Sequence, residues 1–286
     1  MKRVVLLSIL AALFLLPHTD AGAVNFETFF FQTNYSTNPD PAMQQYPEYQ
    51  RDIRLDSVNY NGTTFSSFQL VSAAHVIQND YDPTTGTVDP TLGYRREPYT
   101  IVNTGYGKYT PIDPWVNEGT RSGKYGATDA DLVASYGNLN LNSINYNRER
   151  KTYGIFTISF AQPTDRFFIF ERGMDSDIHL DALDDNGNVL AHWDFLRKGG
   201  YVDTGFDIIV DTGFPGWEST APQSVGTVGI LLNGAAARTL KFTIDSIPDF
   251  GPDLKVFGGA PVPEPATLLL LGAGLIGLAA AARRRR

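Results

Sequence analysis

The sequence predicts an all-β protein whose body, residues 24–257, folds as an antiparallel β-sandwich of jelly-roll type. Short apolar segments recur along this stretch, and turn-forming residues separate them. No long amphipathic helix lies between the two ends of the chain. Cysteine is absent, so a hydrophobic core rather than disulfides must stabilise the fold. Short strands with turns at this spacing are typical of sandwiches and jelly rolls.

The chain begins with a pattern that predicts export. It has a basic start, an apolar run and a small-residue cleavage site, at Lys2 and Arg3, Val4 to Leu16, and Ala21 and Ala23. We expect residues 1–23 to form a signal helix that guides the chain to the Sec machinery and is removed by signal peptidase. The alternative is an N-terminal anchor, which the short apolar run disfavours because it spans a bilayer poorly.

The first half of the body is rich in Asn, Thr, Asp, Pro, Gly and Tyr. Strands are expected at Ser66–Val71 and His75–Ile77. Long turn-rich stretches, residues 79–93 and 106–126, separate the strand candidates of this half. Loops of this length in a compact domain are often functional.

The second half is more regular. We expect strands at Ile155–Phe160, Arg166–Glu171, Ile178–Leu183, Val189–Phe195, Phe206–Val210, Val225–Leu232 and Thr239–Asp245. The second of these is apolar without alternation, which indicates a strand covered on both faces. Asn186-Gly187 predicts a hairpin with a type I′ turn, because this pair favours positive φ angles.

The carboxyl-terminal residues predict a membrane segment. Residues 258–265 form a linker that ends in Pro263, Glu264 and Pro265, and proline keeps such a segment extended. An uncharged run of 17 residues follows, about 26 Å long as a helix. This length is the lower limit for a transmembrane helix. The four residues after it, Arg283, Arg284, Arg285 and Arg286, would remain in the cytoplasm. Residues 266–286 are therefore expected to be a transmembrane helix with an arginine tail.

This order of Pro-Glu-Pro motif, apolar span and basic stop resembles the PEP-CTERM sorting signal of Gram-negative bacteria. The resemblance implies processing by the membrane enzyme exosortase. It also implies an intermediate anchored in the inner membrane with its carboxyl terminus in the cytoplasm. The final location would be the cell surface or the extracellular matrix.

The body carries a second resemblance, to the exosortase-dependent surface proteins, a group of PEP-CTERM cargo proteins. The matching blocks are Glu171-Arg172-Gly173, Asp177 with Ala182-Leu183-Asp184 and Asn186-Gly187, the Val-Gly strand Val225–Leu232, and the closing segment Gly251–Phe257. The resemblance implies a β-rich surface protein. It supplies no activity.

The charge of the body excludes one class of partner. The chain has 23 basic and 31 acidic residues, of which the terminal signals hold six and two, so the body has 17 and 29 and a net charge of −12. Such a body repels phosphate backbones, and nucleic acid is not an expected partner. The absence of cysteine excludes thiol chemistry and cysteine-ligated zinc.

An aromatic cluster supports an alternative function. Its members fall within 32 residues of loop-rich sequence and are Tyr94, Tyr99, Tyr106, Tyr109, Trp115 and Tyr125. Aromatic faces stack on sugar rings, so the body is also consistent with a carbohydrate-binding module for an exopolysaccharide. The competing interpretation is that these rings pack the long loops against the sandwich.

Acidic residues give a candidate for calcium. Asp175, Asp177 and Asp184 lie close in sequence, and calcium prefers several oxygen ligands. The spacing lacks the EF-hand pattern, and Asp184 is also explained by the turn chemistry of the hairpin. No cofactor is otherwise expected.

The sequence has neither a Gly-x-Ser-x-Gly elbow nor a His-Glu-x-x-His motif, and no catalytic residue is assigned. Glu171 after an apolar strand invites a catalytic interpretation, but an ion pair or a bulge at Gly173 explains the segment as well. His179 and His192 flank the predicted hairpin, either as exposed strand residues or as a metal pair. A glycan hydrolase would need two carboxylates facing each other across a cleft. The favoured function is therefore a non-enzymatic, exported surface or matrix protein.

Overall fold

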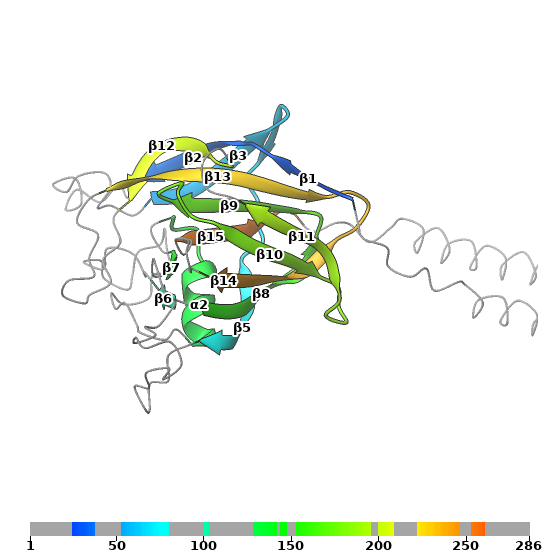
Figure 1. Cartoon of the computed structure of the whole chain (residues 1–286). Helices are drawn as coiled ribbons and strands as arrows, with labels where there is room; N and C mark the ends of the chain where they lie inside the picture. Colours follow the sequence, from blue (N-terminus) through cyan, green and yellow to red (C-terminus); the bar gives the residue numbers. More distant parts are fainter. Residues whose placement is uncertain are drawn as a thin grey trace, which may run out of the picture.

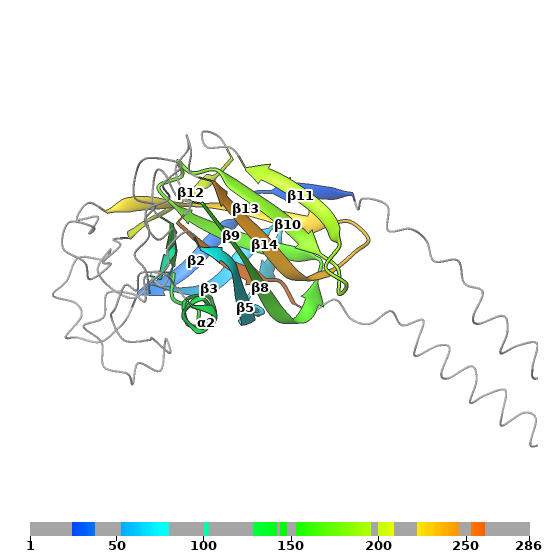
Figure 2. The same ribbon diagram turned by 60° about the horizontal axis from the view of Figure 1, so that its bottom comes forward.

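A computed structural model describes residues 25–37, 53–79, 100–102, 128–141, 144–147, 153–195, 200–208, 222–245 and 253–260. These residues form three antiparallel sheets and one short helix (Figures 1 and 2). The prediction of an all-β fold with antiparallel sheets is confirmed. The predicted signal helix, the Pro-Glu-Pro residues and the predicted transmembrane helix lie outside the described residues.

The largest sheet has the strand order β1-β13-β9-β15-β7-β6, with β12 pairing beside β13. Its strands are β1 (Phe26–Phe29), β6 (Thr100–Val102), β7 (Asn145–Asn147), β9 (Arg166–Arg172), β12 (Val202–Ile208), β13 (Gln223–Leu232) and β15 (Leu254–Gly258). One edge of β13 is shared, because β1 pairs with its second half and β12 with its first half.

Two smaller sheets complete the fold. The five-stranded sheet has the order β11-β10-β14-β8-β5 and contains β5 (Val71–Asn79), β8 (Tyr153–Thr164), β10 (Ile178–Leu183), β11 (Val189–Phe195) and β14 (Ala237–Asp245). The three-stranded sheet has the order β2-β3-β4 and contains β2 (Gln32–Thr37), β3 (Ile53–Tyr60) and β4 (Thr63–Phe65).

Strand β9 shows why the sheets stack in layers. Phe167 and Ile169 point into one core, which they share with residues of the five-stranded sheet. Phe168 and Phe170 point to the other face, into a second core shared with β3. The alternation of a strand thus places apolar side chains on both faces of the large sheet, as the unbroken apolar run of β9 predicts. The large sheet is the middle layer between the other two.

The first predicted strand of the body is wrong over most of its length. Within Ser66–Val71, only Gln69 and Val71 make strand-type pairs, Gln69 as a single bridge to Gly258 and Val71 as the start of β5. The reason is that Gln69 forms hydrogen bonds with the end of β15. Its backbone exchanges two hydrogen bonds with Gly258, of 2.9 and 3.0 Å, and its side chain donates to the Gly259 carbonyl at 3.2 Å. The other candidate, His75–Ile77, lies within β5.

The predicted hairpin between β10 and β11 is present, but its turn is not type I′. Of the Asn186-Gly187 pair only Gly187 has a positive φ, +84°. Asp184 accepts hydrogen bonds from the backbone N–H groups of Asn186 and Asn188, both at 2.8 Å, and these favour a longer connection with a bulge. The Asn61-Gly62 pair between β3 and β4 does have two positive φ angles, +48° and +74°.

A short helix, α2 (Asp129–Tyr136), packs against the edge of the sheets. Thr128 and Asp131 form a capping box at its start, and Leu132 and Tyr136 are buried in the core. Eight residues are too few for a clear helical period, so the sequence did not reveal it. Within the described part of the chain, no helix is long and apolar enough to cross a bilayer.

The chain enters and leaves the large sheet at one end, which we call the terminal end (Figure 1). Gly258 closes β15 opposite Phe167, Phe167 is opposite Ile230, and Ile230 is opposite Thr28 near the start of β1. The two crossings are therefore three strand spacings apart, about 14 Å. The sheet continues to Gly258, one residue beyond the boundary expected from the sequence.

The opposite end of the sheets, which we call the loop end, is marked by Arg172 at the close of β9 and Leu254 at the start of β15. Several strands finish there, each leading into a segment outside the described residues. These segments are residues 38–52, 80–99, 148–152, 196–199, 209–221 and 246–252. The two ends of the fold therefore differ: the chain enters and leaves the large sheet at the terminal end, and strands lead into the undescribed segments at the loop end.

Candidate functional site

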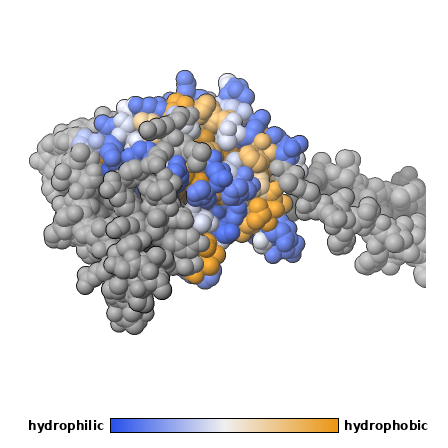
Figure 3. Space-filling model, viewed as in Figure 1, coloured by the Kyte–Doolittle hydropathy of each residue, from blue (hydrophilic) through white to orange (hydrophobic). Residues whose placement is uncertain are grey.

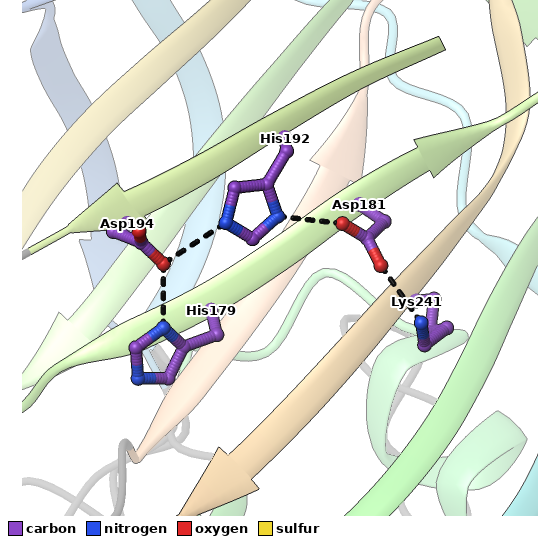
Figure 4. Close-up of polar contacts among 5 residues, drawn as sticks. All are labelled: His179, Asp181, His192, Asp194 and Lys241. Carbon is purple, nitrogen blue, oxygen red and sulfur yellow. Dashed lines mark hydrogen bonds and ion pairs between the residues drawn. The ribbon is translucent and has the colours of Figure 1, made fainter. Parts of the chain in front are cut away.

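A ladder of charged side chains covers the outer face of β10, β11 and β14 (Figure 4). His179 Nδ1 lies 2.5 Å from Asp194 Oδ1, and His192 Nε2 lies 3.2 Å from the same oxygen. His192 Nδ1 lies 2.7 Å from Asp181 Oδ1, and Lys241 Nζ donates to Asp181 Oδ2 at 2.8 Å. We call these five residues the histidine ladder. They alternate along their strands with buried core residues, so they share one solvent-facing surface.

Mutual contacts set the charge states of the histidine ladder. The hydrogen bond with Asp181 raises the pKa of His192, and Asp194 raises it further. Burial acts to raise the pKa of Asp181, but the hydrogen bonds from Lys241 and His192 outweigh it and the pKa is lowered. The hydrogen bond from His179 lowers the pKa of Asp194. The charged forms of these groups therefore support one another.

The two histidines do not face each other across the hairpin. His179 is opposite Asp194 and His192 is opposite Asp181, so each imidazole meets a carboxylate. No group of three His, Asp or Glu side chains in the described ranges lies close enough to hold a metal ion. The arrangement acts as a surface ion network rather than as a metal pair.

We expect the histidine ladder to make stability depend on pH. A raised pKa for His192 stabilises the fold below the ordinary pKa of about 6.5, and this is lost as pH rises through the folded value. The lowered pKa values of Asp181 and Asp194 stabilise it above about 3.9, and this is lost as pH falls. His192→Gln should therefore cost more at pH 5.5 than at pH 8, by less than about 1 kcal/mol because the pair is exposed. Urea unfolding at both pH values measures the difference.

The control is Val189→Thr, an exposed residue of the same strand β11 that has no ionisable group. Its effect on stability should be the same at both pH values. An equal loss for His192→Gln at both pH values would contradict the assignment.

A second polar group is buried at the loop end. Arg172 Nη1 donates to Asp253 Oδ2 at 2.6 Å, and the Arg172 backbone N–H donates to the Asp253 carbonyl at 2.9 Å. The ion pair expected as one interpretation of Glu171-Arg172-Gly173 is therefore present. Gly173 adopts a φ of +100° in the turn that follows, and it is this turn that changes the chain direction.

Glu171 itself has no exposed surface. Burial raises its pKa well above the usual range, and the neighbouring Asp253 raises it further. Contacts with Ser176 and the Met174 backbone act to lower this pKa, but burial outweighs them. Burial thus favours the neutral form of this carboxyl and encloses it in protein, which disfavours the catalytic interpretation.

Lys255 is a third buried charge and is held by α2 and the residues after it. Its Nζ donates to the Ser135 carbonyl at 2.8 Å, to Asn138 Oδ1 at 2.6 Å and to the Asn140 carbonyl at 2.6 Å. Three acceptors satisfy the three donors of the ammonium group. Lys255 therefore fixes the helix to the central strand β15.

The acidic calcium candidates do not come together. Asp175 and Asp177 precede β10, whereas Asp184 follows it, and six residues of strand separate them by about 20 Å. Asp184 also accepts three hydrogen bonds from Asn186 and Asn188, and the Asn188 side chain is the main cause of its lowered pKa. Asp184 thus acts as a turn residue.

Several predicted site residues lie outside the described residues. They are Ala21 and Ala23, the aromatic cluster Tyr94, Tyr99, Tyr106, Tyr109, Trp115 and Tyr125, the motif Pro263, Glu264 and Pro265, and the tail Arg283, Arg284, Arg285 and Arg286. The aromatic interpretation therefore stays a prediction.

One pocket that sequence reasoning missed lies where β1 gives way to β2. It has a volume of about 480 Å³ and is lined by Phe30, Gln32, Asn59, Asn61 and Val202, among others. We call it the β13-edge pocket. Its residues come from three separate segments, so only the exposed Phe30 gives any local signal in the sequence.

The comparisons with known proteins bear on the carboxyl terminus. Residues 261–286 match the PEP-CTERM protein-sorting motif. The match confirms the interpretation of the Pro-Glu-Pro tripeptide, the apolar run and the arginines as a sorting signal. It indicates exosortase-dependent export and surface sorting. No similar curated protein and no similar solved structure was found.

Proposed function

We propose that this chain is the precursor of a non-enzymatic surface or matrix protein of a Gram-negative bacterium. It is exported by Sec, held transiently in the inner membrane, and then processed by exosortase. The observation that carries the proposal is the sorting motif at residues 261–286. The body resembles the exosortase-dependent surface proteins through the blocks quoted above, which supports a surface role.

Physical chemistry gives each part of the signal a role. Proline at positions 263 and 265 restricts the motif to extended conformations and presents Glu264 for recognition. The apolar run is long enough to span the hydrocarbon core when it lies close to the membrane normal. Four arginines stop the chain on the cytoplasmic side and so fix its orientation.

The fold supports this topology. Strand β15 is buried in the middle of the large sheet and ends at Gly258, so four residues, 259–262, separate it from Pro263 of the Pro-Glu-Pro motif. A fully extended chain covers about 17–18 Å from Gly258 to Pro263. Exosortase therefore acts close to the terminal end, and the loop end faces away from the membrane. The predicted signal peptidase site precedes β1 at the same end, so both processing enzymes approach one side of the body.

We expect Glu264→Ala to block processing. In cells that contain the cognate exosortase, the variant should accumulate at full length in the membrane fraction, whereas the parent loses its carboxyl-terminal segment. Intact mass and cell fractionation measure the outcome. Glu27→Ala, an exposed glutamate on β1, is the matched control and should be processed normally. Unchanged mature mass and location for Glu264→Ala would overturn the proposal.

A further inference from the structure

The β13-edge pocket arises from the way one strand edge is divided. β1 pairs with Gly229 to Leu232, and β12 pairs with Gln223 to Thr227, so the chain leaves the edge between them. The buried Thr227 hydroxyl lies 3.4 Å from the Phe31 carbonyl and 3.2 Å from the Val202 carbonyl. These contacts hold the β1–β2 connection and the start of β12 side by side.

The two apolar side chains of the pocket that reach solvent come from these segments. Phe30 is 55% exposed and Val202 is 38% exposed. The next residue, Phe31, turns inward and packs edge-on against Phe168 and Phe170 at 5.1 and 5.6 Å between ring centroids. Phe31 thus anchors the connection and leaves the Phe30 ring on the surface. Figure 3 shows one face of the molecule, where apolar residues form patches among hydrophilic ones.

Three other lining residues carry side-chain amides. Gln32 begins β2, and Asn59 and Asn61 belong to the β3–β4 hairpin. Asn59 is oriented by a 2.6 Å hydrogen bond from the Thr64 hydroxyl to its Oδ1, which leaves its NH₂ as the group to offer a ligand. Asn61 is fixed by the turn, where it has a φ of +48°. Among the described residues that line the pocket, none carries a charged side chain.

We propose that the β13-edge pocket binds a short stretch of a neutral polysaccharide. An exposed aromatic ring offers a face for the C–H groups of a sugar, and amides both donate to and accept from hydroxyl groups. The uncharged side chains of the described lining residues fit a neutral ligand, since a phosphorylated or uronic polymer would call for basic partners. The volume is within the range of about 300–1,000 Å³ that is usual for ligand sites. The site differs from the aromatic cluster predicted between Tyr94 and Tyr125, and it does not depend on the sorting function.

The test uses the full-length chain in a detergent without sugar headgroups, titrated calorimetrically with dextran, laminarin, galactomannan and mannan. Alginate serves as the anionic comparison. We expect binding of at least one neutral polymer and none of alginate. Phe30→Ala should weaken binding about tenfold or more, as truncation of a central aromatic contact does. Asn61→Gly should also weaken it, because glycine keeps the positive φ of the turn but removes the amide.

Phe26→Ala is the matched control, because Phe26 is an exposed phenylalanine of β1 that packs on Trp193 and does not line the pocket. It should bind like the parent. Failure of all four neutral polymers to bind, or equal affinity of the parent and Phe30→Ala, would overturn the proposal. So would a self-association of the parent, seen by sedimentation, that Phe30→Ala abolishes, because the patch would then be an interface between copies.

Discussion

Replacing Arg172 with methionine should lower the free energy of unfolding by about 3–5 kcal/mol, the usual cost of breaking a buried ion pair. The substitution leaves the Asp253 carboxylate, 6% exposed as a residue, without the guanidinium that lies 2.6 Å away. It also places that charge beside the buried carboxyl of Glu171, which interacts unfavourably with it. Urea unfolding of the full-length chain, followed by near-UV circular dichroism, measures the loss.

Two further variants test whether the loss of stability comes from breaking the ion pair or from disturbing the packing around it. Arg172→Met combined with Asp253→Asn should recover part of the loss, because no uncompensated charge remains. Glu171→Gln should change stability little at pH 5.5, because burial raises the pKa of Glu171 and favours its neutral form, which glutamine resembles. A single Arg172→Met variant within about 1 kcal/mol of the parent would contradict the assignment.

Phe168→Ala should lower the free energy of unfolding by about 3–5 kcal/mol, the range for truncating a buried phenylalanine. Its ring has no exposed surface and lies at the centre of an aromatic group. The ring centroids of its neighbours lie 5.1 to 5.9 Å away, and the neighbours are Phe29, Phe31, Phe65 and Phe68. Phe65 belongs to β4 and Phe31 directly precedes β2, so the cavity should loosen the three-stranded sheet first.

Hydrogen exchange combined with urea unfolding measures both effects. Amides of β2 and β3 should lose more protection than those of β10 and β14, which line the other core. Phe30→Ala is the control, because an exposed ring contributes little packing, and its cost should be within about 0.5 kcal/mol. Uniform loss of protection across all strands would show that the two cores do not respond separately.

The strands that the sequence predicted well are those with unbroken local patterns. β10 and β11 match the expected bounds, and β9 extends the expected run by one residue. β3 was missed because its buried residues, Ile53, Leu55 and Val58, are spaced by two and then by three, and a register shift with β2 accounts for the change. The strand expected at Phe206–Val210 lies too far along the chain, because β12 runs from Val202 to Ile208 and its only buried side chains are Phe206 and Ile208.

The candidate sites also differ in whether a local pattern in the sequence predicts them. Counting back from the Asn186-Gly187 turn pairs Asp181 with His192, so the histidine ladder was accessible to sequence reasoning through hairpin register. The Arg172–Asp253 pair was not, because 81 residues separate its members and only the pairing of β9 with β15 brings them together. The β13-edge pocket likewise depends on how distant segments share one strand edge, which no local pattern records.

The position of β15 has a mechanical consequence. This strand lies between β9 and β7 and leads directly toward the sorting motif at residues 261–286. If the chain is held beyond Gly258 and the loop end is pulled, the load runs along β15, and its five paired residues on β9 are strained together rather than one after another. A pull along this strand therefore loads its hydrogen bonds in shear, which resists separation more strongly than peeling the pairs apart singly.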